Sequence, residues 1–186
     1  MDSTRLEREI KLRFPSADAA RDAVLQVGAT PLRGRRLQED CLVDTKGGEL
    51  RTRGAVLRVR VEAGKGRITY KGAPMPAAVT VREELDTVVG DGEVLLRILE
   101  ELGLHTWFRC EKYREEFAYE DVIVAVDETP VGTFVGLEGS EHGIETLAGL
   151  LGRSPADYVL DSYRALFASW QRERHETGRD MVFDEA

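Results

Sequence analysis

The sequence predicts an α+β protein built on a closed, eight-stranded antiparallel β-barrel flanked by helices. About eight segments alternate apolar and polar side chains with the period of two of a β-strand, and three or four have helical periodicity. Strands and helices do not alternate along the chain, which disfavours a parallel sheet. Several strands also carry charge along one face, and closing the sheet with those faces inward would form a charged barrel lumen.

The first predicted strand, Arg5–Phe14, sets this pattern. One face carries charges of both signs, at Arg5, Glu7, Glu9, Lys11 and Arg13. The opposite face is apolar apart from Arg8. If the charged face lines a cavity, it offers metal-binding carboxylates next to cations that can bind phosphate.

The remaining elements follow from periodicity and from capping and turn residues. Alternation predicts strands over residues 30–44, 55–61, 67–71, 79–86, 108–119, 122–126 and 132–138. Helical spacing predicts helices over residues 17–27, 92–102, 141–152 and 155–172. We expect one domain over residues 1–172 and a polar tail over residues 173–186 that frays from His175 onward.

Composition narrows the class of protein. The chain has 186 residues, a formal net charge of −8 and a pI near 5.1, which argues against binding nucleic acid or anionic membranes. No apolar run is long enough to span a bilayer, and the first residues lack the features of a secretion signal. Cys41 and Cys110 lack metal-type spacing, which favours reduced, buried thiols and a cytoplasmic protein. We expect a monomer or a homodimer.

Four strands each place two cations on one face. The pairs are Lys11 with Arg13, Arg58 with Arg60, Arg67 with Lys71, and Lys112 with Arg114. One such strand is more often a strand with a solvated face, but four indicate a cation-lined lumen. Buried charges need partners, and a polyphosphate could supply them because arginine and lysine both bind phosphate oxygens.

Carboxylates on the same faces extend this prediction to a metal. They are Glu7, Glu9, Glu84, Asp127 and Glu138. These groups would repel phosphate unless a cation such as Mg²⁺ or Mn²⁺ bridged the two. The pattern therefore favours a metal-bound triphosphate, although salt bridges across an empty barrel would use the same residues.

Several of these segments resemble, in order, the motifs of one known family. Glu7-x-Glu9-x-Lys11 resembles the ExExK signature of the CYTH domain, the triphosphate tunnel metalloenzymes. Further similar pieces are residues 57–60, 69–72, 82–84, 111–114 and 126–138, and residues 162–166 resemble the C-terminal helix of the family. The resemblance spans residues 5 to about 167.

The resemblance implies an eight-stranded tunnel, a requirement for Mg²⁺ or Mn²⁺, and a substrate such as ATP, thiamine triphosphate or tripolyphosphate. It implies phosphate ligands at Lys11, Arg58, Arg60, Lys71, Arg82, Lys112 and Arg114. It implies metal ligands at Glu7, Glu9 and Glu138, with Glu84 and Asp127 as further ligands or their partners. Glu9, Lys11 and Lys71 are the expected catalytic residues.

One position departs from the family pattern. The last strand often carries Glu-x-Glu, where this chain has Gly136-Leu137-Glu138. The missing carboxylate keeps a non-catalytic nucleotide- or polyphosphate-binding module as one alternative. A class IV-type adenylate cyclase, which forms cyclic AMP and pyrophosphate from ATP, is another, because chain length and residues 40–60 look like that branch. Hydrolysis of a triphosphate is the preferred prediction.

The aromatic residues near the C-terminus are interpreted as packing residues rather than as a platform for stacking a base. They are Tyr163, Phe167 and Trp170, together with Trp107.

Overall fold

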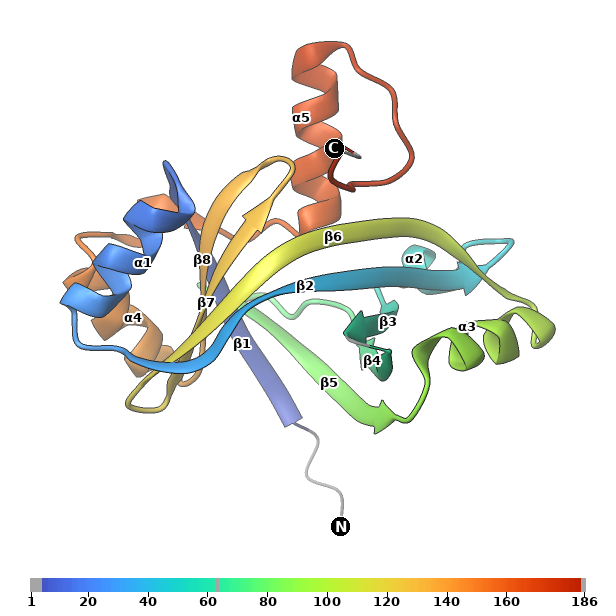
Figure 1. Cartoon of the computed structure of the whole chain (residues 1–186), viewed down its shortest axis with the longest axis horizontal. Coiled ribbons are helices and arrows are strands. Elements are labelled where there is room, and N and C mark those ends of the chain that lie inside the picture. The colour runs from blue at the N-terminus through green and yellow to red at the C-terminus, as the bar shows by residue number, and fades with distance from the viewer. Residues whose placement is uncertain (1–4, 63, 185–186) are drawn as a thin grey trace.

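A ring of eight antiparallel strands forms the centre of the computed structural model, which describes residues 5–62 and 64–184 (Figure 1). These strands are β1 (Arg5–Phe14), β2 (Thr30–Thr45), β3 (Val56–Glu62), β4 (Lys65–Lys71), β5 (Thr80–Val89), β6 (Leu104–Tyr119), β7 (Val122–Thr129) and β8 (Gly132–Glu138). The order around the ring is β1-β5-β4-β3-β2-β6-β7-β8, and β8 pairs with β1 again. The predicted fold class is confirmed.

Strand β1 closes the ring because it pairs with a different partner along each part of its length. Residues Arg5 to Glu9 pair with β5, and residues Glu9 to Phe14 pair with β8 on the other side. Where β5 stops, the two-residue strand β9 (Tyr158–Val159) takes over the same side of β1.

Helices cover the outer face of the barrel. They are α1 (Ala17–Gln26), α2 (Glu49–Thr52), α3 (Gly92–Glu101) and α4 (Glu141–Leu150). Apolar residues of α1 and α4, such as Val24 and Ile144, pack with Ile10 and Leu137 in the largest core cluster. Leu99 of α3 packs with residues of β2 and β3. The short helix α2 is absent from the sequence prediction. The carboxylate of Asp44 caps this helix by accepting hydrogen bonds from the backbone N–H groups of Leu50 and Arg51.

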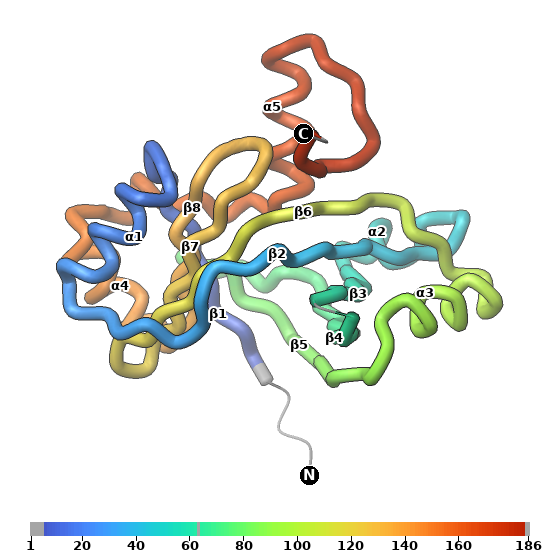
Figure 2. Tube along the Cα trace, in the orientation of Figure 1, coloured from blue at the N-terminus to red at the C-terminus, as the bar shows by residue number. Residues whose placement is uncertain are grey.

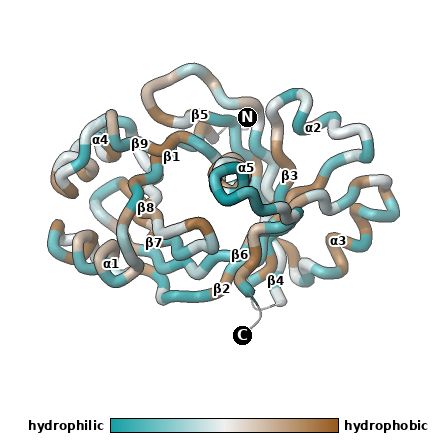
Figure 3. Tube along the Cα trace, turned by 90° about the horizontal axis from the view of Figure 1, so that it is seen from above, coloured by the Kyte–Doolittle hydropathy of each residue, from teal (hydrophilic) through white to brown (hydrophobic). Residues whose placement is uncertain are grey.

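The prediction of one helix over residues 155–172 is wrong. Residues Pro155–Asp157 form a single 3₁₀ turn, β9 follows, and α5 (Tyr163–Arg174) begins only after Ser162, whose hydroxyl accepts a hydrogen bond from the backbone N–H of Ala165. The open edge of β1 explains the interruption, because β9 supplies hydrogen bonds that a helix could not. Figure 3 shows α5 end-on above the ring of strands.

The expected fraying beyond α5 does not occur over residues 178–183. Strand β7 pairs with β6 only from Tyr113 onward, which leaves the preceding part of that edge open. The tail fills it: the N–H of Met181 donates to the carbonyl of Arg109 at 2.9 Å, and the N–H of Glu111 donates to the carbonyl of Met181 at 2.8 Å. Met181 is fully buried, and Figure 2 shows the chain returning from the top of α5 to β6.

Two further expectations can be compared with the described residues. Cys41 and Cys110 are buried and unpaired with each other, as predicted. In residues 5–62 and 64–184, none of the helices has the length and apolar character to cross a membrane.

The contact between α3 and the β3–β4 hairpin depends on glycine. A Cβ atom at Gly66 would lie 2.5 Å from Val89 Cγ2 and 2.7 Å from the Cα atom of Gly92. We predict that Gly66→Ala lowers the free energy of unfolding by on the order of 1–3 kcal/mol, because the helix must move away. Thermal or urea denaturation measures the change.

Gly149→Ala is the matched control. Gly149 lies in α4, and a Cβ there would meet no atom within 4 Å. Removing a helical glycine should raise stability by roughly 0.5–1 kcal/mol. Equal effects of the two substitutions would contradict the proposed close approach.

Candidate functional site

The barrel encloses a cavity of about 700 Å³, lined by side chains from β1 to β6, from β8 and from the base of α5. The predicted site residues that line it are Glu7, Glu9, Lys11, Arg58, Arg60, Lys71, Arg82, Glu84, Lys112, Arg114 and Glu138. Asp127 does not line the cavity, because it is fully buried in β7. Arg13 shares the face of Lys11 as predicted but does not line the cavity; its guanidinium lies 4.8 Å from the centre of the ring of Phe134, its direct neighbour across the β1–β8 pair. The alternating pattern therefore brings most of the predicted residues into one chamber.

Lys71 joins two of the predicted metal ligands. Its Nζ atom lies 2.5 and 2.6 Å from the carboxylate oxygens of Glu7 and 2.9 Å from Glu84 Oε2. Burial raises the pKa of Glu7 to about 7; Lys71 opposes this shift, whereas Glu9 and Glu84 add to it. One lysine therefore does not balance the carboxylates gathered here.

Glu9 lies in a more cationic environment. Burial alone would raise its pKa, but Lys11, at 3.4 Å, and Lys71 outweigh burial and help to lower the pKa to about 2. Glu138 is its direct neighbour across the β1–β8 pair. Gly136 lies beside them, because a Cβ there would be 3.7 Å from Glu9 Oε1. The carboxylate that the family pattern leads one to expect at residue 136 would therefore have faced Glu9.

The opposite part of the lumen holds arginines with unequal partners. Arg60 forms a two-pronged pair with Asp40, with distances of 2.7 and 2.9 Å. Arg58 donates to the hydroxyl of Thr69 at 3.3 Å, and its buried Nε has no acceptor. Burial lowers the pKa of Arg58, and the charge of Arg60 lowers it further. Among the described residues, no ion pair within 4.0 Å involves Arg58.

Asp127, which lies behind the cavity lining, organises a second group of cations that line the cavity. Its two oxygens accept hydrogen bonds from the guanidinium of Arg114 at 2.6 Å each, and Oδ2 also accepts the hydroxyl proton of Tyr163 at 2.6 Å. Lys112 Nζ lies 3.5 Å from Oδ2. Burial and the charge of Arg114 lower the pKa of Lys112 to about 8. These contacts hold the pKa of Asp127 well below its usual range despite burial.

Sequence reasoning missed two residues of the site. Asp40 stands between Gln38 and Leu42 on the inward face of β2, and this alternation could have identified it as a lumen carboxylate. Tyr163 packs its ring edge-on against Phe134 at 5.6 Å between centroids, as a packing residue would. Its hydroxyl bond to Asp127 has no sequence signal, because the two residues meet only in the folded chain.

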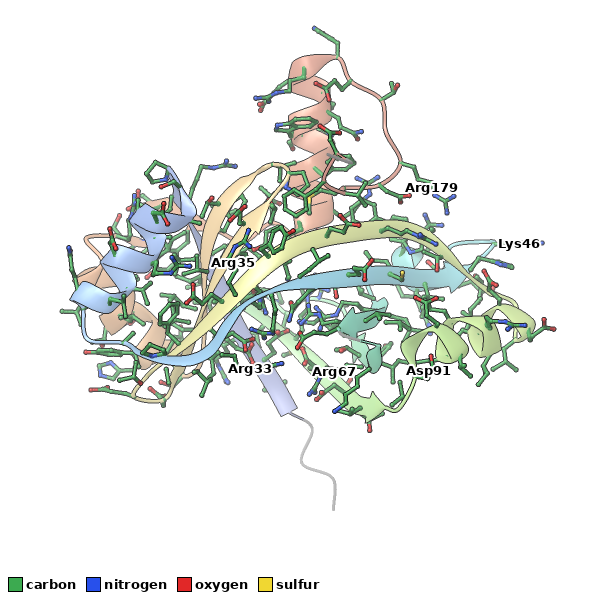
Figure 4. All side chains as sticks on the ribbon, viewed as in Figure 1. Arg33, Arg35, Lys46, Arg67, Asp91 and Arg179 are labelled. Atoms are coloured by element: carbon green, nitrogen blue, oxygen red, sulfur yellow. The ribbon has the colours of Figure 1, made fainter. Side chains whose placement is uncertain are left out.

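The two ends of the cavity differ. Near α5 the lining is apolar and aromatic: Leu42, Trp107, Phe108 and Leu160 are joined by Arg51, whose guanidinium lies 4.3 Å from the centre of the Trp107 ring. At the end away from α5 the lining is charged, and Figure 4 shows Arg33 and Arg67 there. These arginines form ion pairs with Glu62 and Asp86, respectively.

Carboxylate, histidine and cysteine side chains do not come together in threes that could hold a metal ion, as far as residues 5–62 and 64–184 are concerned. Lys71 instead contacts both Glu7 and Glu84, and Lys11 contacts Glu9. These site residues are thus arranged as ion pairs rather than as a closed metal cage.

Comparison with known proteins gives one curated relative with clear similarity. It is "Putative adenylate cyclase MJ0240" from Methanocaldococcus jannaschii, 27% identical over 136 residues, which cover 73% of this chain and 77% of the relative.

Solved structures share the fold. A protein from Vibrio parahaemolyticus described as "a putative adenylate cyclase" matches with a TM-score of 0.75 and 22% identity, over 89% of this chain and 99% of its own. A protein from Hippeastrum, described as a "putative adenylyl cyclase" that reveals a dominant triphosphatase activity, matches with a TM-score of 0.66 and 20% identity, over 89% and 95% of the two chains.

A family model covers most of the chain. The model of the CYTH domain matches residues 5–154, which include all eight strands of the ring. This match agrees with the motifs on the strands and with the inward placement of their charged residues. The chain therefore belongs to the CYTH domain family.

Proposed function

We propose that the protein is a metal-dependent triphosphatase that hydrolyses an organic or inorganic triphosphate inside the barrel. ATP, thiamine triphosphate and tripolyphosphate are the candidate substrates. The activity described for the Hippeastrum protein, which has the same fold, supports hydrolysis as the reaction.

The observation that carries the proposal is that two parts of the lumen have unmatched charge of opposite sign. Burial and a neighbouring arginine lower the pKa of both Arg58 and Lys112 although Asp40 opposes the shift, and the buried Nε of Arg58 has no acceptor, so this part of the lumen can accept a further anion. Burial raises the pKa of Glu7 to about 7, and Glu9 and Glu84 add to this shift while Lys71 opposes it, so the carboxylates around Glu7 can accept a further cation. A polyphosphate that carries a divalent cation supplies both charges together.

The donor set near β1 fits Mg²⁺ or Mn²⁺. Both ions prefer oxygen ligands, and Mg²⁺ is commonly held by one or two carboxylates with phosphate oxygens and water completing the shell. Glu7, Glu9, Glu84 and Glu138 offer such oxygens on three adjacent strands. When bound, the metal neutralises phosphate charge and positions water. A closed cage of three protein ligands is not needed for this chemistry.

The residues of the chain would bind and orient the substrate. Arg58, Arg60, Arg82, Lys112 and Arg114 face the cavity and would donate to phosphate oxygens. In hydrolysis, water attacks the terminal phosphorus and the bond from that phosphorus to the bridging oxygen breaks. The water proton passes to the released orthophosphate, and negative charge grows on the bridging oxygen of the leaving diphosphate group. Lys11 and Lys71, beside the carboxylates, would stabilise that charge. Glu9, with its low pKa, stays ionised and would act as a ligand rather than as a base.

A class IV-type adenylate cyclase is the second candidate. The apolar and aromatic end of the cavity, with Trp107 and Phe108, could hold an organic group such as adenine, which favours this reaction. The name of the Methanocaldococcus relative agrees with it. A non-catalytic polyphosphate-binding module is the third candidate, because Gly136 stands where the family pattern often has a carboxylate.

The products separate the three candidates. With Mg²⁺ or Mn²⁺ we predict release of orthophosphate from ATP, thiamine triphosphate or tripolyphosphate, and loss of turnover when EDTA removes the metal. Cyclic AMP with pyrophosphate would identify the cyclase, and tight binding without turnover would identify the binding module.

Glu9→Gln should lower kcat by roughly 10²–10³-fold, because a charged group that supports the transition state is lost.

Glu83→Gln is the matched control for Glu9→Gln. Glu83 also lies on a barrel strand but does not line the cavity. Its substitution should leave kcat within twofold, and a Glu9→Gln enzyme with full metal-dependent turnover would contradict the site.

Arg58 and Arg60 should respond differently to substitution. Arg58→Gln should raise the Kd of a non-hydrolysable imido analogue of tripolyphosphate about ten- to a hundredfold while leaving thermal stability equal or higher, because Arg58 has no carboxylate partner to abandon. Arg60→Gln leaves Asp40 buried without its partner and should also cost about 3–5 kcal/mol of stability.

Calorimetric titration and thermal unfolding measure the two effects. Equal losses of stability in both variants would mean that Arg58 is a structural residue rather than a phosphate ligand.

A further inference from the structure

Tyr163 occupies a fixed position at the base of α5. It is the first residue of the helix, directly after the capping residue Ser162, and it lines the cavity. Two residues of β9, just before it, are tied to β1. The strands of the barrel and the helix cap therefore both determine where this side chain lies.

The ring and the hydroxyl of Tyr163 contact different cations. The hydroxyl donates to Asp127 Oδ2 at 2.6 Å, and Asp127 holds the guanidinium of Arg114. The ring centre lies 4.9 Å from Lys112 Nζ and 5.5 Å from Lys11 Nζ, distances at which an ammonium group is attracted to an aromatic ring. One side chain thus touches, directly or through Asp127, three cations that face the cavity.

The same contacts occupy Asp127. Oδ1 accepts from Arg114, and Oδ2 accepts from Arg114 and Tyr163, with Lys112 also 3.5 Å away. The carboxylate is fully buried and does not line the cavity. A metal ion could reach it only if these hydrogen bonds were broken and the wall opened.

We propose that Tyr163 and Asp127 form a positioning pair for phosphate binding and that Asp127 is not a metal ligand. Asp127 fixes the guanidinium of Arg114, and the ring of Tyr163 keeps Lys11 and Lys112 apart and facing the lumen. This inference rests on the proposed binding of a triphosphate in the barrel. It replaces the role as metal ligand that the family resemblance suggests for Asp127.

The test separates phosphate affinity from metal affinity. Tyr163→Phe keeps the ring and removes the hydroxyl, and Asp127→Asn removes the charge. Both should raise the Kd of the imido analogue of tripolyphosphate, about three- to tenfold for Tyr163→Phe, because one hydrogen bond in the network is lost. The affinity for Mn²⁺ alone, measured by electron paramagnetic resonance of the free ion, should stay unchanged in both variants.

Steady-state kinetics give a second readout. A positioning role predicts that Tyr163→Phe raises KM more than it lowers kcat, and that Tyr163→Leu, which also loses the ring, has a larger effect than Tyr163→Phe. Tyr158→Phe is the control, because it removes a tyrosine hydroxyl next to β1 but outside the cavity lining. Its phosphate affinity should equal that of the unchanged protein.

Three results would overturn the inference. Weaker Mn²⁺ binding by folded Asp127→Asn protein would make Asp127 a metal ligand. Unchanged phosphate affinity in Tyr163→Phe, with the parent protein binding the analogue, would remove the positioning role alone. A parent protein that binds no analogue and hydrolyses no triphosphate would overturn the proposed function as well.

Discussion

Ionised side chains inside a closed ring of strands are the constraint on which the rest of the structure depends. Pairing of β1 with both β5 and β8 closes the sheet, and alternation then turns the charged faces inward. A charged side chain that is removed from water needs a partner of opposite charge. In the lumen, local ion pairs such as Arg60 with Asp40 and Lys71 with Glu7 provide these partners. Arg58 lacks such a partner, because its buried Nε has no acceptor. This part of the lumen wall can therefore bind an anion that the protein itself does not supply.

The helices are arranged around this ring rather than around a central core. Apart from the apolar group near α5 that includes Phe108 and Phe134, the apolar residues of the strands point outward, where α1, α3 and α4 bury them. The usual placement of apolar and charged residues is thus reversed across the sheet. This reversal is also why so acidic a chain can keep a cationic interior: the net charge of −8 describes the whole chain and not its lumen.

Most of the barrel and its lumen could be predicted from the sequence, because a period of two fixes which side chains share a face. Glu7, Glu9 and Lys11 illustrate this, since closing the ring places all of them in the cavity. Predictions failed where a long-range partner decided the outcome. Strand β9 pairs with the open edge of β1, and the tail around Met181 pairs with the open edge of β6. The local sequence contains no pattern that shows which strand edges remain open for such pairing. The ring of Tyr163 packs against Phe134 as its pattern indicates, but its hydroxyl bond to Asp127 has no local sequence signal because the partner lies on another strand.

The family match ends at residue 154, before β9, α5 and the tail begin. The side chain that binds Asp127 therefore comes from a segment beyond the family match, attached to the barrel through two strand edges. The barrel wall and the element that covers one end of its cavity are thus separate segments of the chain. Substitutions in the covering segment can therefore change what enters the cavity from that end while the hydrogen bonds between the eight strands stay intact.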